Sequence, residues 1–584
     1  MHVSDKQVAS KGRIDFHWQG VPSRRSLSTI LVIEVLVLAL LIRVERLTAP
    51  WSDYFVANGW SHMGWSGAFY STIGRNYLRY GLLTWLAPVI TTGQLPSNEL
   101  VFYPNHPPLL GWLIATTFVL FGEHEWAARL VPLIFSLGNL LVFYVLVARY
   151  CSTSVALITM LLMAVIPMAA YYLGSFPDVQ GPHVLFFMLL NVFFYFRWVE
   201  SSKRAYFIGL VLGTLCGILS DWPGLYTPLV LVAYHGLTQS RGSFPPMAAI
   251  SAASIILALA LIWYLGWLVY DPWILFKAFL LSSIASKPEL PNIDFLAPVP
   301  GWVTTILGNH ILYLYTPIIL SLAISYLFAG RSRGRSRCPS EFQLVLLLII
   351  LGALHVGLGL YAAAMHSYWS MYLAPGLILA AALWLRDLTD PKTRRSTKAR
   401  LISLLASCTV GFLGLYYVAE SLDWREITGY FVALLLFGLA PFFPEKTGQR
   451  EWDTARFNIV AGLLLLVLAA CVETSTISQR DNEGGLGAYV AAAALRDRTS
   501  AAEAILAGPS IAWGQNPPLI YYADRPFIRV DSIESQLAYE SEGRFRYLIL
   551  SKKEQDKDLV AYNTARFHVE AVSGYLLVNL DKRL

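Results

Sequence analysis

Charged residues and cysteines are both scarce in this chain of 584 residues. Only 14% of the residues are Asp, Glu, Lys or Arg, whereas soluble domains carry about 25%. This balance excludes a soluble enzyme, and the hydrophobic share of 56% excludes a disordered chain. The cysteines are also too widely spaced for a CxxC zinc pattern or a disulfide framework; they are Cys151, Cys216, Cys338, Cys408 and Cys471.

Long apolar runs fill the chain instead, and the mean hydropathy is +0.52. Their length and number predict an all-α polytopic membrane bundle of about thirteen spans. The expected spans are 26–46, 127–149, 153–173, 180–197, 205–220, 223–239, 246–270, 302–329, 342–364, 368–385, 401–419, 427–443 and 457–472. The first run is followed by Ile42-Arg43-Val44-Glu45-Arg46 rather than by a small-residue cleavage site, so we interpret it as a signal anchor.

The number of crossings depends on a further apolar run, 107–122. If it spans the membrane, every later loop lies on the opposite side. The run has only about 16 residues and begins with Pro107-Pro108, which favours a re-entrant or interfacial helix over a span. The distribution of Lys and Arg supports that reading, because it then gathers the basic segments on the side of the N-terminus. These segments are 1–25, 197–204, 331–337, 386–400 and 446–456, and we predict that they are cytoplasmic at the plasma (inner) membrane. The net charge of +6 therefore orients the protein in the bilayer, and no nucleic-acid partner is expected.

This topology predicts three parts. A cytoplasmic basic tail covers 1–25, a transmembrane domain with an external loop at 47–126 covers 26–472, and an extracytoplasmic α/β domain covers 473–584. In the last part we expect strands at 504–507, 527–530 and 547–550, alternating with helices at 486–495, 532–539 and 553–562. This domain has neither a Gly-rich phosphate fingerprint nor a cluster of Cys or His, which favours an accessory or acceptor-docking role.

Polar residues gather on the predicted external face. Ionisable groups at a bilayer boundary are functional candidates, although helix ends also tolerate them. The set comprises Asp53, His62, Arg75, Asn105, His106, Asp178, Asp221 and His366. The segment 65–81 carries Phe69, Ile73, Tyr77 and Tyr80 at helical spacing, which predicts an amphipathic helix in the interface. Its Arg75 and Arg79 would then lie near lipid phosphates; we favour phosphate binding for Arg75 and leave simple anchoring open for Arg79.

Several short motifs occur one after another along the chain. An I-x-R-N-Y-L-x-x-G helix at 73–81 precedes a basic residue before P-P-L, and F-G-x-x-E-x-A-A-R-L follows at 121–130. Further on stand F-P-D at 176–178, S-D-W-P-G at 220–224 and H-S-Y-W-S-M-Y-L-A-P at 366–375. This order resembles the GT-C membrane glycosyltransferases, and within them the group of protein O-mannosyltransferases and the bacterial aminoarabinose transferase of lipid A. The resemblance covers roughly the first 390 residues.

The resemblance implies transfer of a sugar from a polyprenyl-phosphate donor to a lipid, glycan or protein acceptor on the extracytoplasmic face. We expect an inverting displacement, which needs one carboxylate base and a stabilised leaving group. Asp178 matches the second acidic position of the family and is the expected catalytic carboxylate, with a helix N-cap as the alternative. The first acidic position, four residues before Tyr70, is Ser66 here, so that role has either moved or changed. Asp53, the nearest outer carboxylate upstream, is the second catalytic candidate.

The remaining candidates would bind the carrier phosphate or support that binding. His106 stands where relatives carry Lys or His before P-P-L, although it could also simply hydrogen-bond a loop. Asp221 is a supporting residue or an N-cap. His366 and Tyr368 contact the phosphate or anchor the aromatic belt. Asn105 replaces a carboxylate that binds metal in some relatives, so no cofactor is assigned and a divalent metal stays an open alternative.

Two alternative functions stay open. A flippase or transporter for lipid-linked sugars predicts ionisable residues buried in mid-span, and Glu34 is the clearest such residue. A catalytically impaired relative is the other alternative, because Ser66 cannot replace a carboxylate base.

Overall fold

The computed structural model describes most of the chain. It covers residues 22–45, 47–52, 55–56, 59–60, 62–81, 89–90, 92–93, 100–103, 105–238, 244–268, 299–329, 341–389, 401–402, 405, 409, 432, 459–467, 469–471, 486–511, 516–552 and 556–584. Asp53 lies outside the described residues, as do nearly all of the predicted spans 401–419 and 427–443 and most of the predicted basic loops.

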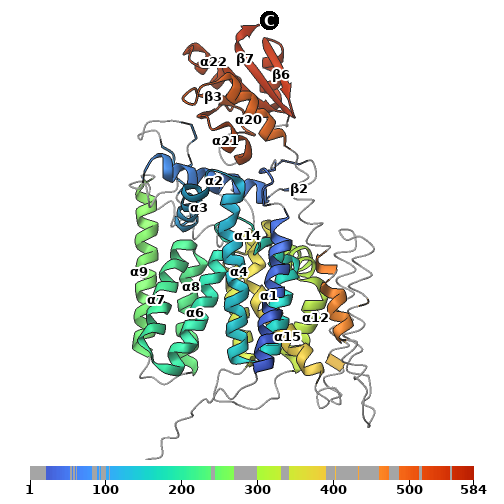
Figure 1. The fold of residues 1–584 in the computed structure, drawn as a ribbon. Coiled ribbons are helices and arrows are strands. Elements are labelled where there is room, and N and C mark those ends of the chain that lie inside the picture. Colours follow the sequence, from blue (N-terminus) through green and yellow to red (C-terminus); the bar gives the residue numbers. More distant parts are fainter. Residues whose placement is uncertain are drawn as a thin grey trace, which may run out of the picture.

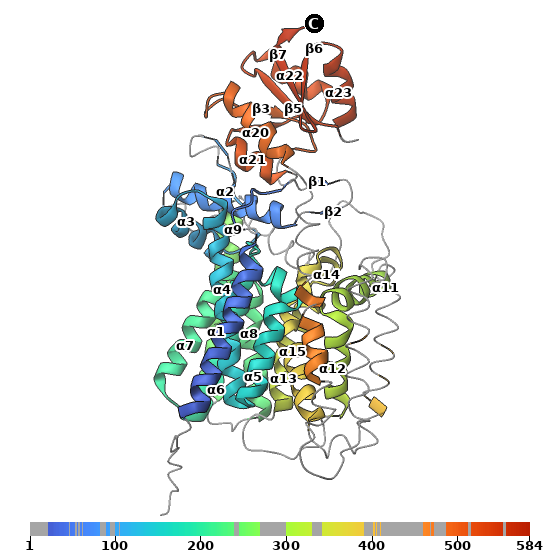
Figure 2. The same cartoon turned by 45° about the vertical axis from the view of Figure 1, so that its right-hand side comes forward.

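A helical bundle forms the lower body of the molecule, and the C-terminal domain sits above one end of it (Figures 1 and 2). The bundle begins with α1 (Pro22–Val44), α4 (Glu125–Tyr150), α5 (Thr153–Val165), the π-helical turn η3 (Met168–Tyr172), α6 (Pro182–Ser201), α7 (Arg204–Ser220), α8 (Pro223–Thr238) and α9 (Phe244–Leu268). It continues with α11 (Val299–Thr305), η5 (Ile306–Leu312), α12 (Thr316–Ala329), α13 (Glu341–Leu358), α14 (Leu360–Met365), the 3-10 turn η7 (Ser367–Leu373) and α15 (Ala374–Leu388).

Five described helices are long and apolar enough to cross a bilayer, and six if one bent pair counts as a span. The five are Glu125–Tyr150, Pro182–Ser201, Phe244–Leu268, Glu341–Leu358 and Ser367–Leu388. Each coincides with a predicted span. Shorter apolar helices occupy further predicted positions, but the total of thirteen stays a prediction.

One predicted span, 302–329, is broken in the structure. Its two halves, Pro300–Leu312 and Thr316–Phe328, meet at 103°. Thr316 at the break has a positive φ of 63°, and Pro317 follows it. A residue before proline is disfavoured in the α conformation, and proline cannot donate to the preceding turn. The Thr316-Pro317 pair therefore explains the bend that the hydropathy of this run does not signal.

Two helices of the first loop form a layer between the bundle and the C-terminal domain (Figure 1). They are α2 (His62–Arg79) and α3 (Leu109–Phe121), with a small hairpin of β1 (Phe55–Val56) and β2 (Gly59–Trp60) just before α2. The 13 residues of α3 extend about 20 Å, which is shorter than a bilayer core of about 30 Å. The short run after Pro107-Pro108 is thus a helix too short to span, as the sequence predicts.

The surroundings of α2 differ from the prediction of an interfacial helix. Nearly every residue from Met63 to Tyr77 is buried, because α3 covers one side of α2 and the C-terminal domain covers another. The apolar spacing correctly predicts the helix. It does not reveal that the polar side, with Arg75 and Arg79, faces protein rather than lipid headgroups.

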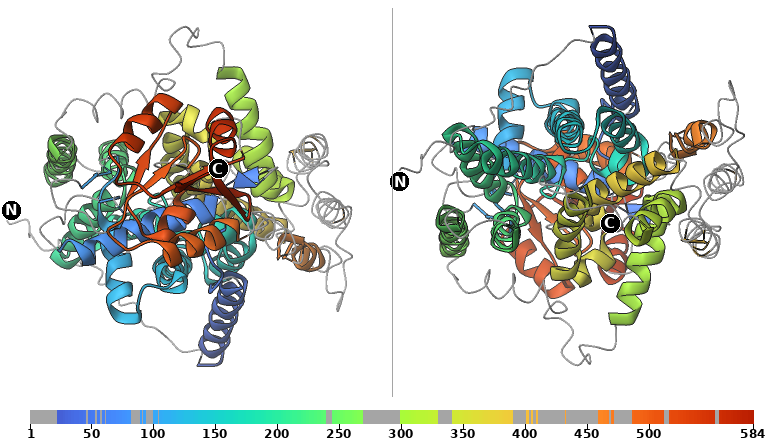
Figure 3. Two further views of the ribbon diagram at one scale, coloured as in Figure 1. Left: turned by 90° about the horizontal axis from the view of Figure 1, so that it is seen from above. Right: turned by 90° about the horizontal axis from the view of Figure 1, so that it is seen from below.

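The C-terminal domain is a five-stranded sheet with helices on both faces (Figure 3). Its elements are α20 (Gly487–Arg498), β3 (Ile505–Ala507), α21 (Pro517–Ala523), β4 (Phe527–Arg529), α22 (Ile533–Ser541), β5 (Tyr547–Ser551), α23 (Lys557–Thr564), β6 (Phe567–Val572) and β7 (Tyr575–Arg583). The strand order is β4-β3-β5-β7-β6, with β4, β3 and β5 parallel and the other pairings antiparallel. The three predicted strands and three predicted helices are confirmed within a few residues.

Alternation along the strands gives the sheet two apolar faces. Leu506 and Leu548 belong to a core on the face toward α22 and α23. Ile505 and Ile549 point to the opposite face, where they share a core with α20 and α21 and with residues of α2, α3 and α4. The hydrophobic core thus continues from the C-terminal domain into the first-loop helices and fixes the domain on α2.

Candidate active site

Asp178 lies in the turn that joins η3 to α6. Its side chain accepts a hydrogen bond from the backbone N–H of Gln180 at 3.0 Å, and only 4% of the residue is exposed. The N-cap of α6 is Gly181, so the alternative role of Asp178 as a helix cap is wrong. The carboxylate is held by its own turn and directed toward α2.

Ser66 on α2 provides the second contact of Asp178. Its Oγ donates to Oδ2 of Asp178 at 2.7 Å, and both residues are buried. The serine therefore occupies the position of the expected family acid but serves as a hydrogen-bond donor to the carboxylate that remains. A hydrogen bond to a charged group contributes about 1.5–3 kcal/mol, so Ser66 stabilises the ionised form of Asp178.

A histidine and a second aspartate form the neighbouring pair. Nδ1 of His106 lies 2.8 Å from Oδ1 of Asp221, whose side chain is fully buried in the turn between α7 and α8. The next residue in that turn, Trp222, donates its indole N–H to the carbonyl oxygen of Asn105 at 2.9 Å. Oδ2 of Asp221 has no hydrogen-bond partner within the described part of the chain. The contact that the structure shows for the Asp221 side chain is the one with His106.

Tyrosine rings surround these groups. Tyr368 contacts the ring of Phe176, two residues before Asp178, at 5.4 Å, and His366 stacks on Tyr368 at 5.3 Å. Tyr103 lies 5.8 Å from the ring of His106. A small cleft beside His106 is lined by Tyr70, Tyr103, Pro107 and Pro108 among others. The site therefore combines ionisable groups with an aromatic and proline-rich wall.

The two ionisable centres influence each other. Burial raises the pKa of Asp178, and the hydrogen bonds from Gln180 and Ser66 and the charge of His106 oppose that shift. Burial alone would lower the pKa of His106, but the charge and hydrogen bond of Asp221, with help from Asp178, outweigh it and raise this pKa. The arrangement thus pairs a base with increased proton affinity and an imidazole that retains its proton to higher pH.

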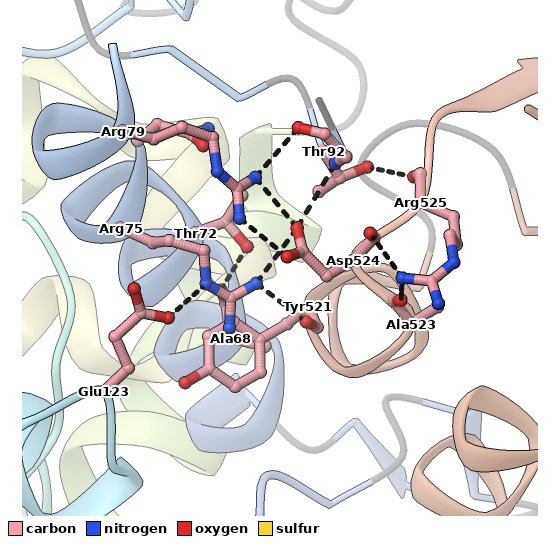
Figure 4. Close-up of polar contacts among 12 residues, drawn as sticks. Ala68, Thr72, Arg75, Arg79, Thr92, Glu123, Tyr521, Ala523, Asp524 and Arg525 are labelled. Atoms are coloured by element: carbon pink, nitrogen blue, oxygen red, sulfur yellow. Dashed lines mark hydrogen bonds and ion pairs between the residues drawn. The ribbon is translucent and has the colours of Figure 1, made fainter. Parts of the chain in front are cut away.

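Arg75 lies elsewhere. It is nine residues after Ser66 on α2, which corresponds to about 13.5 Å along the helix. Its Nε bonds Glu123 at 2.7 Å, and its Nη1 lies 3.0 Å from the carbonyl oxygen of Tyr521 and 3.4 Å from Asp524 (Figure 4). The expected role of Arg75 in phosphate binding is corrected by this placement, because C-terminal and α3–α4 groups occupy its guanidinium.

Asp524 is the centre of the contact between the C-terminal domain and α2, which we call the α2 junction (Figure 4). Both carboxylate oxygens accept from Arg79, at 3.0 and 2.7 Å, and Oδ1 also accepts from the backbone N–H of Gly93 at 3.2 Å. Asp524 has a left-handed φ of 47°, which aspartate tolerates better than most residues. Arg75 and Arg79 lower the pKa of this carboxyl although burial opposes them.

The motif at 121–130 contributes to the same contact. Glu125 accepts a hydrogen bond from the hydroxyl of Tyr522 at 2.7 Å, and that hydroxyl also accepts from the backbone N–H of Trp51. Arg129 donates to the carbonyl of Leu47 at 2.9 Å, and its guanidinium lies 3.9 Å from the ring of Trp51. These motif residues hold the domain and the first loop in place rather than line the cleft.

The structure thus brings together most of the residues predicted for the site: Asn105, His106, Asp178, Asp221, His366 and Tyr368. Tyr70 and Tyr103 were missed, although Tyr103 stands three residues before His106 in the motif. Within the described residues, no three His, Cys, Asp or Glu side chains are placed to hold a metal ion. The described His, Cys, Asp and Glu residues therefore do not fit a metal centre.

We predict that Ser66→Ala slows the expected sugar transfer by roughly tenfold at neutral pH. The reason is that Asp178 loses the hydrogen-bond donor that favours its ionised form. The pKa of Asp178 should rise further, so the acid limb of the pH–rate profile should move to higher pH. Ser71→Ala is the matched control, since the buried hydroxyl of Ser71 on the same helix makes no hydrogen bond to a described residue. An unshifted acid limb in Ser66→Ala would contradict this role.

A family model and several solved structures are similar to this chain. Residues 105–270, which include His106, Asp178 and Asp221, match the dolichyl-phosphate-mannose-protein mannosyltransferase family. No curated protein matches the chain by sequence.

Solved structures with a similar fold cover nearly the whole chain. ArnT from Cupriavidus metallidurans in the apo state has a TM-score of 0.57 and 16% identity, covering 96% of this chain and 98% of its own. The same protein bound to undecaprenyl phosphate has a TM-score of 0.59 and 15% identity, with the same coverage of both chains. The apo oligosaccharyltransferase of Archaeoglobus fulgidus has a TM-score of 0.50 and 13% identity, covering 89% of this chain and 69% of its own.

Proposed function

Since the chain resembles the GT-C membrane glycosyltransferases and has the fold of ArnT, we propose that it transfers a sugar from a polyprenyl-phosphate donor to an acceptor hydroxyl. The observation that carries this proposal is the buried Asp178 carboxylate within electrostatic reach of the His106–Asp221 pair, whose histidine lines a small cleft. One group can accept a proton while the other binds an anion, and displacement at a sugar phosphate needs both.

The proposed reaction is a single displacement. An acceptor hydroxyl oxygen bonds to the anomeric carbon while the bond from that carbon to the phosphate oxygen breaks. Asp178 accepts the hydroxyl proton, and the electron pair of the broken bond goes to the phosphate. Protonated His106 stabilises the polyprenyl phosphate that leaves. The product has the inverted anomeric configuration because only one displacement takes place.

The wall of the cleft suits a lipid carrier. Pro107 and Pro108 lie beside His106 at the start of α3, next to tyrosine side chains. An isoprenoid chain can pass along such an apolar surface into the bilayer while its phosphate stays at His106. A related structure with undecaprenyl phosphate bound supports this class of ligand.

The location follows from the same proposal. We place the cleft and the domain 473–584 on the extracytoplasmic face of the plasma (inner) membrane, with the basic tail 1–25 in the cytoplasm and 26–472 as the membrane domain. The basic loops support this orientation. The C-terminal domain would then stand above the cleft, where a lipid, glycan or protein acceptor approaches.

The test is release of the carrier. The purified full-length protein is incubated with a panel of polyprenyl-phosphate sugars and an extract of cell-envelope lipids and glycans, and free polyprenyl phosphate is quantified. We expect release with at least one donor. Movement of intact donor across proteoliposomes without any release would favour a flippase and contradict the proposal.

A further inference from the structure

The loop that carries His106 is tied to the α7–α8 turn at two points. Asp221 bonds the imidazole at 2.8 Å, and Trp222 bonds the backbone of Asn105 at 2.9 Å. Asp221 is fully buried, whereas 22% of the His106 side chain is exposed, toward the cleft. A buried acid therefore supports a histidine that is itself accessible.

The contact fixes both the orientation and the proton of the imidazole. Because Nδ1 faces the carboxylate, it carries the proton of that hydrogen bond, and Nε2 is the nitrogen left for a ligand. An imidazole whose Nδ1–H is held by an anion gains a second proton at Nε2 more readily. A protonated Nε2 can donate to a phosphate oxygen in a charge-assisted hydrogen bond.

The other titratable groups around the pair do not supply this cation. Tyr70 and Tyr103 line the cleft together with His106, and Asp178 lies within electrostatic reach of His106; all three are acids. On the inner side, His183 of α6 and His355 of α13 lie within the electrostatic reach of Asp221. His355 is engaged through Nδ1 by the hydroxyl of Tyr226, and His183 is fully buried, so neither is placed at the cleft.

We propose that Asp221 is a positioning residue that holds His106 as an imidazolium with its Nε2–H toward the cleft, and that carrier-phosphate binding is lost as His106 deprotonates. This inference rests on the proposed function, because it takes polyprenyl phosphate as the ligand of the cleft. It adds a pH response to the site. Affinity is high while His106 is charged and falls as the pH rises through its titration.

Replacing His106 with lysine keeps a positive charge at this position without the need for the contact with Asp221. A lysine has an ordinary pKa near 10.4 and stays charged across the range in which an imidazole titrates. In a His106→Lys protein, phosphate binding should be independent of pH between about 7.5 and 9, a range that lies above the second ionisation of the phosphate monoester near pH 6. It should also become insensitive to removal of the Asp221 charge.

The experiment measures the affinity of the full-length protein in nanodiscs for radiolabelled undecaprenyl phosphate as a function of pH. Asp221→Asn should lower the pH midpoint of binding and weaken binding about tenfold at neutral pH. His106→Lys/Asp221→Asn should restore tight, pH-independent binding, which also reports that the Asn variant still folds. Trp222→Phe removes the hydrogen bond to the Asn105 backbone and leaves the Asp221 carboxylate in place. The pH midpoint of binding of this variant should match that of the wild type.

Three results would overturn the inference. The first is an unchanged midpoint in Asp221→Asn while the wild type binds. The second is a double variant that folds, by its melting temperature, and still binds weakly. The third is a wild-type protein that binds undecaprenyl phosphate at no pH, which would overturn the proposed function as well.

Discussion

Asp178→Asn should reduce sugar transfer by about 10²–10⁴-fold, the usual contribution of a positioned acid or base. The amide keeps an oxygen for the N–H of Gln180 and can still hydrogen-bond Ser66, so the turn should keep its shape. Binding of undecaprenyl phosphate should persist, because the contact between His106 and Asp221 stays intact. The measurement is the initial rate of transfer alongside the affinity for the carrier.

A buried aspartate at a distant place is the control. Asp387 on α15 pairs with Arg386, and its side chain is only 6% exposed. Asp387→Asn should leave the rate within a fewfold of the wild type. If Asp178→Asn retained full transfer activity, the base would have to be another group, and Asp53 would become the first candidate.

Asp524→Asn should loosen the α2 junction. The substitution removes one carboxylate shared by Arg75 and Arg79 and keeps a residue that tolerates the left-handed backbone. Breaking a fully buried pair costs about 3–5 kcal/mol, and we expect about 2–3 kcal/mol here because 28% of the side chain is exposed. The melting temperature in detergent should fall. Transfer should fall as well, since α2 also carries Ser66.

The stability effect has a charge-matched control in the same domain. Asp531 pairs with Arg529 at the surface, where both side chains are about half exposed. Exposed pairs of this kind contribute about 0–1 kcal/mol, so Asp531→Asn should melt like the wild type. If Asp524→Asn and Asp531→Asn had the same melting temperature and the same rate of proteolytic cleavage, the ion pairs of Asp524 would not hold the C-terminal domain on α2.

Local patterns predicted the elements whose cause is local. Alternation and turn residues located β3, β4 and β5, and the length of the run after Pro107-Pro108 marked α3 as too short to span. The hairpin of β6 and β7 was missed. Its signal is present as Ser573-Gly574, both with positive φ, which form the turn between two alternating segments.

Contacts between distant segments explain what the sequence could not reveal. Arg75 contacts Tyr521 across 446 positions, and no spacing within α2 distinguishes that partner from a lipid phosphate. The bond between Ser66 and Asp178 spans 112 positions in the same way. The candidate residues Asp178 and His106 were found by motif, whereas their contacts with Ser66 and Asp221 needed the folded chain.

A structure of the full-length protein with undecaprenyl phosphate in a nanodisc tests the central claim most directly. We predict the phosphate within hydrogen-bond distance of His106 Nε2, with the isoprenoid chain leaving past Pro107 and Pro108 and the Asp178 carboxylate facing the space where a sugar would stand. A phosphate bound away from His106, with no lipid in the cleft, would contradict the proposed active site.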